Sequence, residues 1–418
     1  MSFLEKTVWE ILSDKKYKPE NENTKSVLTH YLHNAKNEFA EFYRKDAIDF
    51  TKEMLRHNCP GKNINSQKAE EILQESLVNC AKIPFPAPDN PKFTFIDLFA
   101  GIGGFRLAMQ SLGGKCVYTS EWDKKAKHTY FVNFGEFPFG DITLENTKYY
   151  IPNNFDILCA GFPCQAFSIA GKRGGFEDTR GTLFFDVAEI IKRKQPKAIF
   201  LENVKGLINH DKGKTLKTIL NVLRNDLQYF VPEPQIINAK DFGVPQNRER
   251  IFIAGFHKNT EVTEFEYPKP LNKKISFGNV KEENIVPTKY YLSTVYLTTL
   301  EKHKKRHEKK GNGFGFEIIP DSGTANAVVC GGMGRERNLV YDPRITDFTP
   351  STNIKGEVNR KGIRKMTPRE WARLQGFPDK YIIPVSDASA YKQFGNSVAV
   401  PAVRETASKI LDKLKKQS

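Results

Sequence analysis

Residues 93–106 decide how the chain folds, and they read Phe-Thr-Phe-Ile-Asp-Leu-Phe-Ala-Gly-Ile-Gly-Gly-Phe-Arg. The apolar run from Phe93 to Phe99 is typical of a buried strand. A Gly-rich turn follows at once and leads into a helical pattern. Such a turn lets backbone N–H groups approach a ligand at the end of the strand. The same glycines would equally suit tight packing of a strand against a helix, so the turn alone leaves both roles open.

Outward from this stretch, short apolar runs alternate with longer helix-like segments. The predicted strands are Phe93–Phe99, Phe155–Ala160, Ala198–Leu201 and Ile251–Phe256. The predicted helices between them include Thr182–Lys194 and Thr215–Leu227. This alternation predicts the α/β fold class, with a doubly wound and mostly parallel sheet.

The pattern differs on both sides of this core. Residues 1–90 are helix-like, with apolar residues at helical spacing from Thr24 to His57, and they end in a Pro-rich linker at residues 83–91. We therefore expect a helical N-terminal extension at 1–90, to which the sequence assigns no function. The α/β core is expected at 93–270 together with 391–418. The polar, Gly-rich segment 271–364 is expected to form a small second domain, with a hinge at 365–390.

Composition limits the class of protein. The chain has 418 residues, enough for two or three domains, with a net charge of +15 and a pI near 9.3. The basic charge fits a nucleic acid partner, although a Lys-rich solvated surface would produce it too. No apolar run reaches the roughly 20 residues needed to cross a bilayer, and no signal peptide pattern is present at the start. We expect a soluble, cytoplasmic protein that does not bind membranes.

The chain has six cysteines, none of them in a C-x-x-C pair or in a Cys/His cluster with zinc-ligand spacing. No metal is therefore expected. Most of these thiols should be buried and reduced. Cys159 falls in a predicted strand, whereas Cys164 falls beyond it, in the loop Gly161-Phe162-Pro163-Cys164-Gln165. A thiol exposed in such a loop loses its proton more easily, so Cys164 is the candidate nucleophile.

Acidic residues follow several of the predicted strands. Glu121, beside Trp122, comes at the expected end of the second strand, and Asp141 comes before Ile142 at another probable strand end. An acidic residue in this position can accept both hydroxyls of a ribose, while an aromatic neighbour stacks on a base. Together with the Gly-rich turn, these residues predict a cofactor that contains a nucleoside.

Two further elements follow the cysteine loop in the chain. Glu202, in Leu201-Glu202-Asn203-Val204, places a carboxylate at the carboxyl end of a strand, where open α/β sheets assemble their sites. Arg248 and Arg250 precede the next strand, and residues i and i+2 of an extended chain point to the same side. Surface salt bridges would be the plain explanation for the two arginines.

At this point the sequence resembles the DNA (cytosine-5)-methyltransferases of bacterial restriction-modification systems. The resemblance covers about Phe93 to Leu414 and six motifs in the family's order. These are Phe-Ala-Gly-Ile-Gly-Gly, Gly-Phe-Pro-Cys-Gln, Glu-Asn-Val, Gln-x-Arg-x-Arg, Arg364-Lys365-Met366-Thr367-Pro368-Arg369-Glu370 and Gln393-Phe394-Gly395-Asn396-Ser397-Val398. Such an enzyme has a Rossmann-like fold that uses S-adenosylmethionine, and it carries a target-recognition domain, expected here at 271–364.

The resemblance implies a role for each matching residue. Cys164 would add to C6 of a flipped-out cytosine, Glu202 would bind N3 and the exocyclic amine, and Arg250 would hold O2 with help from Arg248. In the donor pocket, Glu121 would bind the ribose, Trp122 would stack on adenine and Asp141 would contact its amine. The remaining implied cofactor-binding residues are Phe99, Gly101, Gly103, Gly104, Ile142, Pro163, Asn396 and Val398.

DNA contacts are implied in two segments. Ser168 resembles a phosphate-contacting serine, and the glycines around Lys172 and Arg173 would let that loop close over DNA, although they could form a plain surface loop. Arg335 and Arg337 could read guanines or could bind phosphates. The variable region resembles the HpaII type of modification methylase, which implies a CCGG target.

The implied partner is double-stranded DNA, and a cognate restriction endonuclease would share the target site without binding this chain. A monomer is expected. Three alternatives are an RNA (cytosine-5)-methyltransferase, a catalytically silent DNA-binding paralogue and a thiol or redox enzyme. The complete set formed by Cys164, Glu202, Arg248 and Arg250 argues against the silent paralogue.

Overall fold

The computed structural model describes residues 19, 21–58, 64–75, 83–163, 183–271, 273–313, 315–331, 335–349 and 356–415. The chain divides into two compact units. Unit 1 contains Met1–Gln235, Ile251–Tyr267 and Thr406–Ser418, and unit 2 contains Ile236–Arg250 and Pro268–Glu405. Cys164 and the residues Ser168, Lys172 and Arg173, which are expected to contact DNA, lie outside the described residues.

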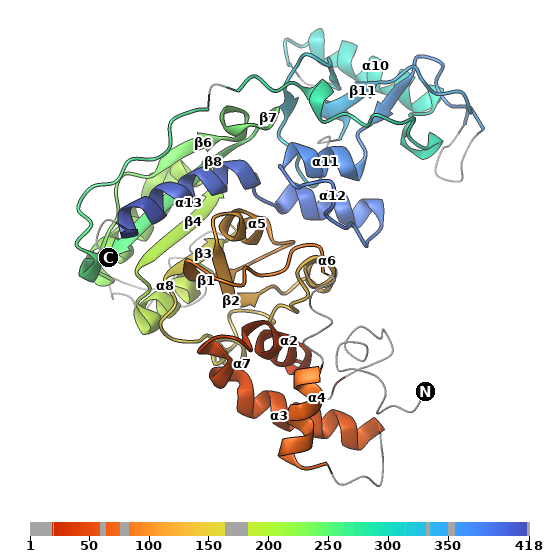
Figure 1. The fold of residues 1–418 in the computed structure, drawn as a ribbon. Coiled ribbons are helices and arrows are strands. Elements are labelled where there is room, and N and C mark those ends of the chain that lie inside the picture. Colours follow the sequence, from red (N-terminus) through yellow and green to blue (C-terminus); the bar gives the residue numbers. More distant parts are fainter. Residues whose placement is uncertain are drawn as a thin grey trace. The chain divides into compact units, whose positions relative to one another are not determined.

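Unit 1 is built on a mostly parallel sheet whose strands lie in the order β2-β1-β3-β4-β8-β5 (Figure 1). These strands are β1 (Phe93–Leu98), β2 (Gly114–Ser120), β3 (Ile157–Gly161), β4 (Ala198–Val204), β5 (Tyr229–Phe230) and β8 (Glu249–His257). The pairs β1–β2, β1–β3 and β3–β4 are parallel, and β5 pairs with β8 in the antiparallel direction. The chain moves outward from β1 to β2 and returns to β3 on the other side of β1, so the strand order reverses beside β1. The predicted doubly wound α/β class is confirmed.

Helices connect these strands and extend the unit at its N-terminal end. They are α2 (Thr24–Asn34), α3 (Phe39–Asn58), α4 (Ser66–Glu75), α5 (Gly104–Ser111), α6 (Lys124–Phe134), α7 (Glu145–Lys148), α8 (Leu183–Lys194) and α9 (Lys214–Asn221), the last continued by the π-turn η5 (Val222–Asp226). A 16-residue helix, α13 (Val400–Lys415), ends in this unit. One apolar cluster contains residues of α2, α3 and α4 together with residues of the sheet, so the N-terminal helices share the core of the α/β unit.

Unit 2 has short strands and small apolar clusters. Its elements are β6 (Gln235–Asn238), which begins one residue before the unit, β7 (Gln246–Asn247), α10 (Thr294–Glu308), β9 (Ile318–Ile319), β10 (Ala325–Asn326), β11 (Leu339–Tyr341), β12 (Ile363–Lys365), α11 (Pro368–Leu374) and α12 (Asp387–Asn396). Strands β12, β11 and β9 form a three-stranded sheet, and β10 pairs with β7. Helix α11 begins with Thr367 and Glu370 in a reciprocal capping box, with Pro368 in its first turn.

The compact units do not follow the functional domains expected from the sequence. Unit 1 includes the N-terminal helices, and unit 2 includes residues 236–250 and 365–405 in addition to 271–364. The compact units are defined by contacts within the chain, whereas the expected domains were defined by their expected roles. The division into catalytic, recognition and hinge regions therefore remains a proposal.

Candidate active site

Four strands of unit 1 bring the predicted residues to one edge of the sheet. Parallel register places Leu98 beside both Ser120 and Ala160, and it places Gly161 beside Glu202. The residues that follow β1, β2 and β3 therefore emerge at the same carboxyl edge as Glu202, with β1 at the point where the strand order reverses. Ligands of open α/β sheets bind at such a point.

The carboxylate of Glu121 is held in place by the backbone on two sides. The N–H of Gly101 donates to Glu121 Oε2 at 2.8 Å, and the N–H of Asp123 donates to Oε1 at 2.7 Å. Burial raises the pKa of Glu121, while these backbone hydrogen bonds oppose that shift. Each carboxylate oxygen retains a further lone pair. The group is therefore fixed in orientation and still able to accept hydrogen bonds.

The turn after β1 leaves space beside this carboxylate. Phe99 and Gly101 both have left-handed backbone conformations, with φ of 57° and 56°. A Cβ atom built on Gly101 would have no heavy atom within 4 Å. Gly103 differs, because a Cβ there would lie 2.2 Å from a ring carbon of Phe134. Gly101 thus faces open space, whereas Gly103 allows α5 and α6 to approach each other, and Gly104 is the buried first residue of α5.

Trp122 follows Glu121 in the chain, and the segment that leads to Asp141 is hydrogen-bonded to Glu121. The side chain of Trp122 is 76% exposed, so its ring is free to stack on a planar group. The N–H of Glu121 donates to the carbonyl of Phe139 at 3.0 Å, which ties β2 to the segment that leads to Asp141. Asp141 Oδ1 accepts from the N–H and the hydroxyl of Thr143, and Ile142 is buried.

Glu202 and the start of the cysteine loop lie on neighbouring strands. Glu202 is 7% exposed, and Pro163, the last described residue before Cys164, is exposed. Asn203 Nδ2 donates to the carbonyl of Phe162 at 2.8 Å and so fixes the chain just before Pro163. The sequence motif contained Asn203, but no role was predicted for it. Cys159 is fully buried in β3, as predicted.

In unit 2, the guanidinium of Arg248 is buried and bound to backbone carbonyls. Nη1 donates to Val328 at 2.8 Å, and Nη2 donates to Gly395 at 3.0 Å and to Ser397 at 2.6 Å. These bonds hold the chain on both sides of Asn396, whose Oδ1 accepts from the Cys330 thiol at 3.2 Å. The arrangement indicates that Arg248 positions this segment. The sequence could not predict this role, because whether an arginine is exposed or buried depends on contacts with residues distant in the chain.

Other motif residues of unit 2 also bind main-chain groups or are buried. Arg250 is partly buried and donates from Nη1 to the carbonyl of Glu249, and Val398 is buried. The fully buried side chain of Gln246 donates to the carbonyl of Leu374 and accepts from the N–H of Val328. No function was predicted for Gln246, although its place in the Gln-x-Arg-x-Arg motif would have singled it out.

The two arginines expected to contact DNA, through bases or phosphates, are exposed in unit 2. The guanidinium of Arg335 lies 5.4 Å from the centre of the Tyr391 ring, and Arg337 Nη2 lies 3.5 Å from Glu317 Oε1. Both contacts are at the surface and would be weak, so the side chains can be redirected towards another partner.

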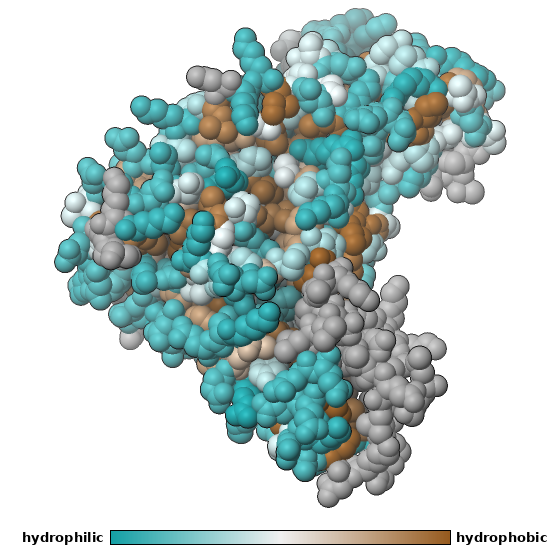
Figure 2. Space-filling model, in the orientation of Figure 1, coloured by the Kyte–Doolittle hydropathy of each residue, from teal (hydrophilic) through white to brown (hydrophobic). Residues whose placement is uncertain are grey.

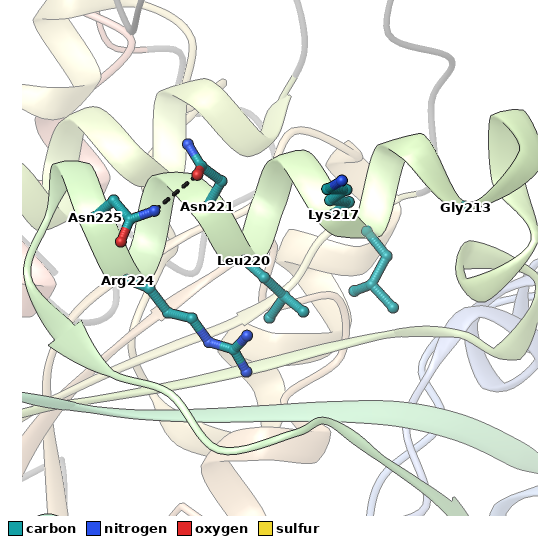
Figure 3. Close-up of a pocket in the computed structure, with 7 residues that line it drawn as sticks. Gly213, Lys217, Leu220, Asn221, Arg224 and Asn225 are labelled. Carbon is teal, nitrogen blue, oxygen red and sulfur yellow. Dashed lines mark hydrogen bonds between the residues drawn. The ribbon is translucent and has the colours of Figure 1, made fainter.

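A shallow hollow on α9 lies apart from all of these residues (Figure 3). Asn225 Nδ2 donates to Asn221 Oδ1, and Arg224 is bound to Glu233 and to the carbonyl of Val231. The full lining is Gly213, Leu216, Lys217, Leu220, Asn221, Arg224 and Asn225. Because no predicted site residue lines it and three of its polar side chains are already hydrogen-bonded, we do not consider it part of the active site.

Among the described residues, no group of three or more His, Cys, Asp or Glu side chains could hold a metal ion. No helix within the described part of the chain is long and apolar enough to cross a membrane. The doubly wound sheet thus presents a Gly-rich turn and acidic residues at one carboxyl edge, an arrangement that can bind a nucleoside-containing ligand.

Comparison with known proteins identifies the family. The C-5 cytosine-specific DNA methylase family matches residues 93–412, and the chain belongs to this family. It is 77% identical to the type II methyltransferase M.HpaII of Haemophilus parainfluenzae over 352 residues, which cover 82% of this chain and 98% of that protein. The chain is therefore a DNA (cytosine-5)-methyltransferase of the type II restriction-modification family, and the thiol or redox alternative is excluded.

Two further comparisons bear on the extension and the fold. M.MspI of Moraxella sp is 38% identical over 389 residues, covering 91% of this chain and 85% of that protein. That alignment must include part of the N-terminal helices, because residues 93–418 make up less than four fifths of the chain. The crystal structure of S. pombe Dnmt2 methyltransferase matches 77% of this chain and 99% of that chain with a TM-score of 0.56 and 18% identity, which supports the fold.

Proposed function

We propose that the chain methylates C5 of cytosine in the duplex sequence CCGG with S-adenosylmethionine as donor, and so protects host DNA from a restriction endonuclease with the same target. The observation that carries this proposal is the shared carboxyl edge of β2, β1, β3 and β4, where Glu121, the Gly101 turn, the Pro163 loop and Glu202 emerge. Similarity to M.HpaII supports the choice of target.

The donor pocket fits an adenosyl group on this chain's own geometry. Glu121, held by Gly101 and Asp123, would accept the ribose hydroxyls, and the exposed Trp122 ring would stack on adenine. The open space at Gly101 lets the backbone approach the ligand closely. When bound, the donor supplies an electrophilic methyl group from its sulfonium centre. Phe99, Gly103, Gly104, Asp141, Ile142, Pro163, Asn396 and Val398 complete the proposed set.

The base would be attacked by Cys164. Its thiolate adds to C6, the electrons move towards N3, and Glu202 hydrogen-bonds N3 and the exocyclic amine so that N3 gains a proton. Arg250 holds O2. After C5 is methylated, a base removes the C5 proton, and the C5–C6 double bond forms again as the C6–S bond breaks. Cys164 then leaves as the thiolate, and N3 returns its proton to Glu202. Arg248 acts indirectly, because its guanidinium is bound to the carbonyls of Gly395 and Ser397, on either side of Asn396, and to that of Val328.

Contacts with DNA would come from two segments. The target base must leave the duplex to reach Cys164, and Ser168, Lys172 and Arg173 would bind phosphates around it. Arg335 and Arg337 would contact the target sequence. We propose that one copy suffices for the reaction, that it takes place in the bacterial cytoplasm, and that the endonuclease shares the site without binding this chain.

The test is base-resolution mapping of 5-methylcytosine in plasmid DNA from cells that express the chain, with Cys164→Ser as the matched inactive control. Methylation confined to CCGG, and absent from the control, supports the whole proposal. Methylation at another motif would keep the chemistry and reject the target. Absence of methylation from well-folded wild-type protein would favour the silent-paralogue or RNA alternative, and retained methylation in Cys164→Ser would mean that the nucleophile is misassigned.

Glu121→Ala tests the donor pocket by itself. Because it removes the proposed ribose acceptor, we expect weaker binding of S-adenosylhomocysteine in calorimetry and little change in DNA affinity. The reverse ranking of the two affinities would reject the donor pocket.

A further inference from the structure

Strand β2 is an edge strand of the sheet, and the N-terminal helices bind its outer main-chain groups. The hydroxyl of Tyr43, on α3, donates to the carbonyl of Val117 at 2.9 Å. The N–H of Thr119 donates to Nε2 of His30, on α2, at 3.2 Å. Thr119 is two residues before Glu121, so α2 is attached to β2 just before the proposed ribose carboxylate.

The hydrogen bonds of His30 define its protonation state. Nδ1 lies 2.8 Å from the carbonyl of Ser26, so it must carry the proton and donate. Nε2 must then be the acceptor for the Thr119 N–H, which makes the ring neutral. Glu136 Oε1 lies 3.4 Å from Nε2, but Glu136 is paired with Arg106 at 2.6 Å. Burial lowers the pKa of His30, Glu136 opposes this shift, and Arg106 and Lys127 add to it.

Helix α2 also holds the segment that leads to Asp141. Ser26 Oγ donates to the carbonyl of Pro138 at 2.9 Å, and the N–H of Phe137 donates to Thr29 Oγ1 at 2.9 Å. The His30 ring packs against Phe139 with a centroid distance of 4.7 Å. Phe139 in turn donates its N–H to the carbonyl of Thr119. One helix therefore contacts both chain segments that present the proposed donor-binding carboxylates.

These contacts are more polar than packing alone requires. His30, Ser26 and Thr29 are all fully buried, and the side chain of each makes a hydrogen bond to a residue outside α2. Figure 2 shows hydrophilic residues on the visible surface of the N-terminal helices, whereas Ser26, Thr29 and His30 are buried beneath the surface. A buried polar group is costly unless it is paired, and its pairing fixes one arrangement of its neighbours.

We propose that the N-terminal helices are a positioning element of the donor site, in which His30 acts as a positioning residue for Thr119 to Glu121 against Phe139 to Asp141. The inference rests on the donor pocket proposed above. His30 lies outside residues 93–412, which the family match covers, so the proposal extends the donor site beyond the methylase domain.

The test compares two substitutions of the same side chain. His30→Leu keeps most of the volume but leaves the Thr119 N–H without an acceptor, whereas His30→Gln places an amide oxygen about where Nε2 lies. The probe is S-adenosylhomocysteine, titrated by calorimetry into the full-length protein without DNA. We expect roughly fivefold weaker binding for His30→Leu, a typical size for coupling between sites. His30→Gln should restore most of the affinity. Turnover at saturating donor should be the same for both variants as for the wild type.

Leu73→Ala is the matched control for damage to the extension. Leu73 is fully buried in α4, a helix that packs on α3, and its loss should lower the melting temperature without weakening donor binding. Equal affinities for wild type and a folded His30→Leu would overturn the inference. So would equal weakening by His30→Leu and Leu73→Ala. If Glu121→Ala also leaves the affinity unchanged, the proposed donor pocket itself fails, which separates the two failures.

Discussion

The sheet of unit 1 and residues 271–364 of unit 2, the proposed recognition segment, are stabilised in different ways. The sheet and the N-terminal helices share one large apolar cluster. In the recognition segment, the apolar clusters around Leu292 and Val286 have only five and four buried members. There the fully buried Arg364 is paired with Asp342 at 2.9 Å and with Glu370 at 2.7 Å. Unit 1 also contains a buried pair, Arg106 with Glu136, but it lies beside a large apolar core. In the recognition segment the apolar clusters are small, so paired buried charges make up a larger share of the stabilising contacts.

The largest effect should follow from removing the centre of that ion network. Arg364→Met leaves Asp342 and Glu370 buried without their shared partner, which typically costs about 3–5 kcal/mol. We expect this loss in urea unfolding of the full chain, together with nearly normal binding of S-adenosylhomocysteine by Glu121 in unit 1. Arg344→Ala is the control, because Arg344 also pairs with Asp342 but is partly exposed, and it should cost within about 1 kcal/mol. Similar losses for the two variants would contradict the comparison.

Acid should destabilise unit 1 before it affects the ion network of unit 2. Burial lowers the pKa of His33 to about 4. As pH falls below 6.5 the unfolded chain takes up a proton that the folded His33 does not, so stability is lost between pH 6.5 and about 4, by at most about 3 kcal/mol. Although burial opposes its charge, Arg344 and Arg364 lower the pKa of Asp342 to about 2. The stability that Asp342 contributes is therefore complete above pH 3.8 and is lost only as pH falls towards 2.

Urea unfolding at pH 7, 5.5 and 4.5 measures this difference, and His33→Asn should flatten the decline. A decline of the same slope in the variant would assign the acid sensitivity to other groups.

Substitutions of Gly101 and Gly103, in the turn after β1, should have smaller effects on stability, and these effects should differ. Gly103→Ala forces a Cβ against Phe134 and should cost about 2 kcal/mol of stability. Gly101→Ala faces open space and should cost only about 1 kcal/mol for its left-handed backbone. Yet Gly101→Ala should weaken S-adenosylhomocysteine binding, because its methyl group would occupy the proposed pocket. Melting temperature and calorimetry distinguish the two, and unchanged affinity in Gly101→Ala would count against the pocket.

The smallest effect on stability should come from the recognition surface. Arg337→Ala removes only an exposed contact with Glu317 and should change stability by less than about 0.5 kcal/mol. If Arg337 reads a guanine, DNA affinity should fall for CCGG and much less for unrelated duplexes. A uniform fall with a lower salt dependence would identify a phosphate contact instead.

The sequence predicted the parts of the fold that depend on local pattern. The expected strand Phe93–Phe99 corresponds to β1 at Phe93–Leu98, and the expected helix Thr182–Lys194 corresponds to α8 at Leu183–Lys194. The helical pattern from Thr24 to His57 is interrupted between α2 and α3, where Ala35 to Glu38 form turns. Apolar spacing continues across that break, because both helices face the same core, so periodicity could not reveal it.

The rest depended on contacts between distant residues. The motifs placed Glu121 and Glu202 at strand ends, but one of the two backbone donors to Glu121, Gly101, lies in the turn after another strand. Arg248 matched a catalytic motif and proved to be buried against three carbonyls. His30 lies in a segment that resembled no family, and only its contact with Thr119 indicates a role.

The same contact between α2 and β2 bears on how this protein can be divided. An edge strand with free N–H and C=O groups is a template for pairing with another chain. Here Tyr43 and His30 occupy the outer groups of Val117 and Thr119. A methylase domain cut out at residue 93 would uncover this strand and the apolar surface beneath the helices, and would tend to aggregate. The N-terminal helices therefore protect the sheet against self-association. In recombinant work they should be kept, and a fusion partner should be attached before them in the chain.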